Sequence, residues 1–137
     1  MKFLSPRVHG VLDYLLAALF LVVPFWLDFT SPLARSLCFV YGGALLAVSL
    51  LTRYPLGVLR VIPFPVHGGL EFIASLALIA SPWLAGFEGV FPARNFFVAT
   101  GVALFAVWLT TDYKAAELTT PSSLTRESPA HHPSPTR

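Results

Sequence analysis

The sequence predicts an all-α membrane protein with four transmembrane helices, built as two parallel two-helix repeats. Hydrophobic residues make up 55% of the 137 residues and charged residues only 12%, which is too few charges to cover a soluble globule of this size. The apolar residues fall in four long runs, and the last two runs repeat the first two. A lipid bilayer is the solvent that suits such a chain.

The duplication is visible residue by residue. The segment VHGVLDYLLAALFLVVPFWLDF, at residues 8–29, aligns without a gap with VHGGLEFIASLALIASPWLAGF, at residues 66–87. After one inserted residue, residues 34–54 align with residues 93–113. Because each repeat contains an even number of helices, both copies cross the membrane in the same direction. The two repeats are therefore predicted to be related by a pseudo-twofold axis along the membrane normal.

Four spans are predicted from the apolar runs, at residues 8–27, 37–51, 70–87 and 96–109. Pro6 and Pro65 lie near the starts of the first and third helices, where the missing N–H of proline costs little. Pro24 and Pro82 lie near the other ends, beside aromatic residues that suit the headgroup layer. The second and fourth runs are shorter than the roughly 20 residues that cross a hydrocarbon core, so we expect them to stand with little tilt.

The repeats divide the chain into five parts. We expect a cytoplasmic N-terminus, a first repeat, a cytoplasmic linker containing Pro and Gly, a second repeat and a disordered cytoplasmic tail dominated by Pro, Ser and Thr. These parts cover residues 1–7, 8–54, 55–66, 67–114 and 115–137.

The basic residues predict the topology. Arg35 and Arg94 fall on one side of the predicted spans, and more basic residues fall on the side of the termini: Lys2, Arg7, Arg53, Arg60 and Lys114. By the positive-inside rule, both termini are predicted to be cytoplasmic in a protein of the cell (inner) membrane. The sequence pI of about 9.0 reflects this asymmetry, so no nucleic-acid partner is expected. The first run contains Asp13 and lacks an Ala-x-Ala site, so we expect it to be retained rather than cleaved as a signal peptide.

Four polar residues lie in matching positions of the two repeats: His9 and Asp13 in the first run, His67 just before the third run and Glu71 within it. An i, i+4 spacing places histidine and carboxylate on one helix face, and the duplication places both pairs at the same depth. A carboxylate within a bilayer is costly unless it faces protein. The sequence therefore predicts one polar cluster near the cytoplasmic surface.

Several roles remain open for this cluster. Each pair can be a helix cap and ion pair with a purely structural role. Two imidazoles and two carboxylates are also a ligand set for a divalent metal such as Zn²⁺, Fe²⁺ or Mn²⁺, in a redox or hydrolytic protein. A proton or ion relay uses the same groups, although the span centres offer no continuous polar path. Haem ligation by His9 and His67 is a weaker alternative, because both lie in a first turn.

The proline positions also carry a family resemblance. Ser81-Pro82-Trp83 stands in the second repeat where the first repeat has Val23-Pro24-Phe25, which keeps the proline and an aromatic residue. On this motif the chain resembles the SPW-repeat family of small bacterial membrane proteins, over residues 8–113. The resemblance implies a four-helix membrane fold and no established activity.

The sequence therefore favours a non-catalytic membrane module, with a metal-binding membrane protein as the alternative. No catalytic residue is predicted, and a divalent metal is the one cofactor left open, with His9, Asp13, His67 and Glu71 as its candidate ligands. The lipid bilayer is the expected partner. A second copy of the chain, as a homo-oligomer, and another membrane protein remain open as further partners.

Overall fold

In the computed structural model, residues 3–114 are described, and they form four α-helices joined by short connections. The helices are α1 (Pro6–Trp26), α2 (Pro32–Leu51), α3 (Phe64–Leu84) and α4 (Phe91–Thr110). Each is long and apolar enough to cross a membrane. The prediction of an all-α protein with four helices long and apolar enough to span a membrane is confirmed. The predicted tail at 115–137 lies outside the described residues.

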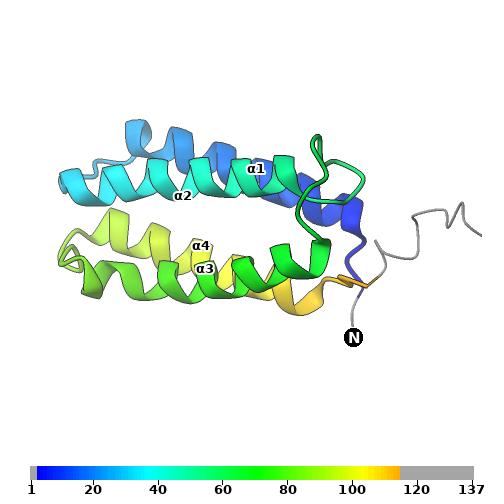
Figure 1. Cartoon of the computed structure of the whole chain (residues 1–137). Helices are drawn as coiled ribbons and strands as arrows, with labels where there is room; N and C mark the ends of the chain where they lie inside the picture. The colour runs from blue at the N-terminus through cyan, green and yellow to red at the C-terminus, as the bar shows by residue number, and fades with distance from the viewer. Residues whose placement is uncertain (1–2, 115–137) are drawn as a thin grey trace, which may run out of the picture.

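The helices form two hairpins that lie side by side (Figure 1). Most of the close backbone neighbours between helices lie within the hairpins, between α1 and α2 and between α3 and α4. Both α1 and α3 begin at one end of the molecule, which is also the end where α2 and α4 finish (Figure 1). We call this end the terminal end.

The prediction that the second and fourth spans are short is wrong. Both α2 and α4 have 20 residues, enough to cross a hydrocarbon core. Their first turns contain Arg35 and Arg94, which ended the apolar runs but did not end the helices. Ser31 starts α2 by accepting a hydrogen bond from the backbone N–H of Ala34, 3.3 Å away. α3 also starts early, at Phe64, within the predicted linker at 55–66.

A glycine lies at the closest approach in each hairpin. A Cβ atom on Gly42 would lie 3.2 Å from the carbonyl oxygen of Ala17, and one on Gly101 would lie 2.9 Å from that of Ser75. Both glycines occupy matching positions of the duplicated sequence. Small residues at these positions let the paired helices pack closely within a membrane.

The terminal end is held together by two short backbone pairings. The N–H of Leu4, before α1, donates to the carbonyl of Thr110 at the end of α4 (3.1 Å). The N–H of Ile62, before α3, donates to the carbonyl of Leu51 at the end of α2 (2.8 Å). The segment that leads into each hairpin thus binds the end of the other hairpin.

Candidate metal centre

α1 and α3 bring the four polar residues of the duplicated motif together. His9 and Asp13 come from α1, and His67 and Glu71 from α3. Each is at most 2% exposed, and one ligand atom from each residue lies within 4.8 Å of all the others. The structure therefore places every sequence-predicted site residue in one cluster, within the first eight residues of α1 and of α3 at the terminal end.

The nitrogen and oxygen atoms of the cluster surround a common point. The Nε2 atoms of His9 and His67 are 3.3 Å apart, and each lies 3.3 Å from Oδ2 of Asp13. The carboxylate of Glu71 places Oε2 3.3 Å from Nε2 of His9, and Oε1 3.6 Å from Nε2 of His67. Charge-assisted N–H···O bonds are usually shorter, about 2.7–2.9 Å. The atoms are near neighbours without being well-formed hydrogen-bond pairs.

Two threonines fix the orientation of the imidazoles. Nδ1 of His9 lies 2.9 Å from Oγ1 of Thr111, and Nδ1 of His67 lies 2.8 Å from Oγ1 of Thr52. Each threonine hydroxyl donates its one hydrogen to the backbone carbonyl four residues earlier, at 2.6 and 2.7 Å. It must therefore accept a hydrogen bond from Nδ1–H. In a neutral imidazole, this leaves the lone pair of each Nε2 directed at the centre of the cluster.

The two carboxylates accept hydrogen bonds from different side chains. Tyr113 donates to Oε2 of Glu71 at 2.6 Å, whereas Ser49 donates to Oδ2 of Asp13 at 3.1 Å. Tyr54 occupies the position in repeat 1 that Tyr113 occupies in repeat 2, but its buried hydroxyl has no hydrogen-bond partner among the described residues. The aspartate is one methylene shorter than the glutamate, which accounts for this difference.

Aromatic rings cover the cluster at the terminal end. Phe64 stacks on Tyr54 with ring centroids 5.6 Å apart, and lies 4.8 Å from Tyr113 and 5.2 Å from His9. Burial, together with the nearby carboxylate charges, raises the pKa of both tyrosine hydroxyls above their ordinary range. Tyr113 therefore stays protonated and able to donate to Glu71.

The structure adds residues to the site that the sequence did not predict as site residues: Thr52, Thr111, Ser49, Tyr54 and Tyr113. The sequence held one signal for four of them, because Thr52 matches Thr111 and Tyr54 matches Tyr113 in the duplication. Ser49 gave no such signal, since Trp108 stands in its place in the second repeat.

The haem alternative does not fit this geometry. A haem bound between two histidines needs its porphyrin plane between the two ligating nitrogens. The Nε2 atoms are only 3.3 Å apart, and the carboxylates of Asp13 and Glu71 lie beside both of them. The donor set instead suits a small cation.

A family model described as the SPW repeat domain matches residues 7–111. The chain belongs to the SPW repeat family. The match spans all four helices and both halves of the polar cluster, and it confirms the resemblance seen in the sequence motif. No curated protein and no solved structure matches the chain. Membership in the SPW repeat family and the four apolar helices together identify a multi-pass membrane protein, and neither assigns it an activity.

Proposed function

We propose that the protein is a zinc-binding membrane module, in which His9, Asp13, His67 and Glu71 are the metal ligands. The spacing of the ligand atoms carries this proposal. A tetrahedral ion about 2.0–2.2 Å from its nitrogen and oxygen ligands separates those ligands by about 3.3–3.6 Å. The spacings given above between the nitrogens, and from nitrogens to carboxylates, run from 3.3 to 3.6 Å, with the two spacings of Glu71 measured from its two different oxygens. With one ligand atom taken from each residue, all four atoms lie within 4.8 Å of one another.

The charges of the cluster also favour a divalent cation. Two neutral imidazoles and two carboxylates leave two negative charges in a site that is closed to solvent, and buried charges need compensation. Oε1 of Glu71 is buried and has no hydrogen-bond partner among the described residues, although it lies 3.6 Å from Nε2 of His67. One divalent ion at the centre would neutralise the site and bind this oxygen.

The ligand set favours zinc and a structural role. Imidazole and carboxylate ligands also bind Fe²⁺ and Mn²⁺, but tetrahedral geometry is typical of Zn²⁺. Four protein ligands fill a tetrahedral site, as in structural zinc centres, whereas catalytic centres keep one position for water or substrate. Since two ligands come from α1 and two from α3, the ion would join the two hairpins. We therefore propose a non-catalytic role for the site.

We also propose that the hairpins are related by a pseudo-twofold axis along the membrane normal, with both termini cytoplasmic in the inner membrane. Matching contacts support the axis: His9 with Thr111 corresponds to His67 with Thr52. The two backbone pairings at the terminal end correspond in the same way. The excess of Lys and Arg at this end supports the topology.

Metal analysis of protein purified without chelators tests the function. We expect one zinc ion per chain, which His67→Ala removes while the protein still elutes as a folded species. His131→Ala is the matched control, because it removes a histidine from the segment outside the described residues. A wild-type protein that contains no metal and takes up none from added zinc would show that the cluster is an ion-pair network of protonated histidines.

A further inference from the structure

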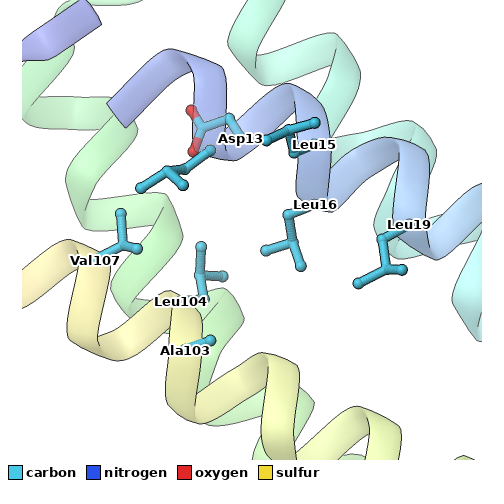
Figure 2. A pocket seen from close by; sticks show the side chains of 8 residues that line it. Asp13, Leu15, Leu16, Leu19, Ala103, Leu104 and Val107 are labelled. Carbon is cyan, nitrogen blue, oxygen red and sulfur yellow. The ribbon is translucent and has the colours of Figure 1, made fainter. Parts of the chain in front are cut away.

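An apolar groove lies between α1 and α4, in the half of the helices nearer the terminal end. Its volume is about 420 Å³. Leucines from α1 face Leu104, Ala103 and Val107 of α4 across an open space, and Asp13 lies at one end (Figure 2). Apart from this carboxylate, the side chains that line the groove are leucine, alanine and valine.

The duplication repeats this groove between the other two helices. A space of about 270 Å³ lies between α2 and α3. Its lining includes Leu70, Glu71 and Ala74, which match Leu12, Asp13 and Leu16 of the first groove. The α2 residues Ala44, Leu45 and Val48 likewise match the α4 residues Ala103, Leu104 and Val107. A groove kept in both copies is a property of the repeat rather than an accident of one packing contact.

The first groove opens toward the surface that faces lipid. Leu15 in its wall is 62% exposed, and Leu19 is 41% exposed. Both belong to a helix that is long and apolar enough to span the membrane, so hydrocarbon rather than water surrounds them. The occupant of the groove must therefore be apolar.

A basic residue, Arg7, lies on α1 between the terminal end and the first groove, without lining the groove itself. Arg7, Val11 and Leu15 recur at every fourth position of α1 and are all exposed, so they form one stripe that runs from the first turn of the helix into the groove. Eight residues of helix place Leu15 about 12 Å deeper than Arg7. A phosphate beside the Arg7 guanidinium would have its hydrocarbon chain at the depth of the groove.

We propose that this groove binds one acyl chain of an anionic phospholipid, with the lipid phosphate beside Arg7. The size of the groove favours a single chain over a protein helix. A helix with its side chains is about 10 Å across, so 420 Å³ would hold only about one turn of it. The proposal is independent of the zinc site, although the two share Asp13 as a neighbour.

Native mass spectrometry of detergent-purified protein titrated with phosphatidylglycerol tests the site. Ala103→Trp fills the groove from an exposed position of α4, and Val102→Trp puts the same ring on the neighbouring position, which is 54% exposed and does not line the groove. We expect wild type and Val102→Trp to retain one phospholipid, and Ala103→Trp to bind it at least tenfold more weakly. Arg7→Gln should remove the preference for phosphatidylglycerol over phosphatidylethanolamine.

Helix content by circular dichroism and zinc content are measured on the same samples. If Ala103→Trp does not fold, Ala103→Leu narrows the groove by less and is interpreted in the same way. Equal lipid retention in Ala103→Trp and Val102→Trp would overturn the proposal. So would a wild-type dimer that Ala103→Trp dissociates, because a second copy would then fill the groove. Zinc content reports separately on the proposed function.

Discussion

At the scale of single residues, the hydroxyl groups of Thr52 and Thr111 decide what the histidines can do. Each hydroxyl donates a hydrogen bond to a backbone carbonyl of its own helix and accepts one from Nδ1–H of a histidine. The Nε2 atom of each histidine is therefore available at the centre of the cluster. Histidine ligands of metals usually have their second nitrogen held in this way. The two threonines are thus positioning residues for the proposed zinc ion.

Thr111→Val should therefore weaken zinc binding by about 10-fold to 100-fold, because valine keeps the volume and loses the group that orients His9. Thr110→Val is the matched control, since the Thr110 hydroxyl bonds to carbonyls of its own helix. Competition with a zinc chelator measures both affinities. Equal affinities of the two variants would mean that the threonine does not act on the ligand.

At the scale of elements, the glycine after each histidine lets a helix accept an aromatic ring at its surface. A Cβ atom on Gly68 would lie 2.7 Å from the ring of Tyr113, whereas one on Gly69 would meet nothing within 4 Å. The two adjacent glycines of α3 therefore have different surroundings. Gly68 makes room for the tyrosine that supports Glu71, and Gly69 faces open space.

Gly68→Ala should destabilise the protein by about 1–3 kcal/mol, because the ring of Tyr113 is buried and has little room to move. Gly69→Ala should be neutral or stabilising by up to about 1 kcal/mol, since alanine is the better helix former. Thermal unfolding in detergent compares the two variants. The proposed packing is wrong if Gly68→Ala unfolds at the same temperature as Gly69→Ala.

The sequence predicted the elements better than it predicted their ends and partners. The four apolar runs predicted the number of helices correctly, and the duplication predicted that His9 and His67 lie in one cluster. Hydropathy placed the start of α2 too late, because Arg35 lies in its first turn without ending it. The contact of His9 with Thr111 joins residues 102 positions apart, and it depends on the register between α1 and the end of α4. Helical periodicity carries no information about that register.

At the scale of the whole molecule, one end of the bundle concentrates the features that join the hairpins. The polar cluster, the aromatic cover of Tyr54, Phe64 and Tyr113, and both backbone pairings all lie at the terminal end. Toward the other end, the hairpins are joined by apolar packing that includes Phe20 and Phe97. If the terminal end is cytoplasmic, the proposed metal site is loaded from the cytoplasm.

The topology is open to a direct test. The bias of Lys and Arg toward the terminal end predicts that a reporter fused after Tyr113 lies in the cytoplasm. A fluorescent protein fused at this position should therefore be fluorescent, and alkaline phosphatase fused there should be inactive. The same reporters inserted at Gly89, in the connection between α3 and α4, should give the opposite pattern. Phosphatase activity after Tyr113 would place the terminal end outside.

A zinc ion that joins the hairpins should also stabilise the whole bundle, because binding to the folded state alone adds free energy by mass action. Free zinc at 100 times its dissociation constant would stabilise the protein by about 2.7 kcal/mol. We expect a chelator to lower the unfolding temperature of the wild type in detergent, and added zinc to restore it. Glu71→Gln keeps the size of the side chain and one oxygen acceptor but removes one ligand charge. The unfolding temperature of this variant should therefore respond far less to the chelator or to added zinc. A wild-type unfolding temperature that is the same with chelator and with zinc would mean that the cluster holds the hairpins together through its own hydrogen bonds and ion pairs.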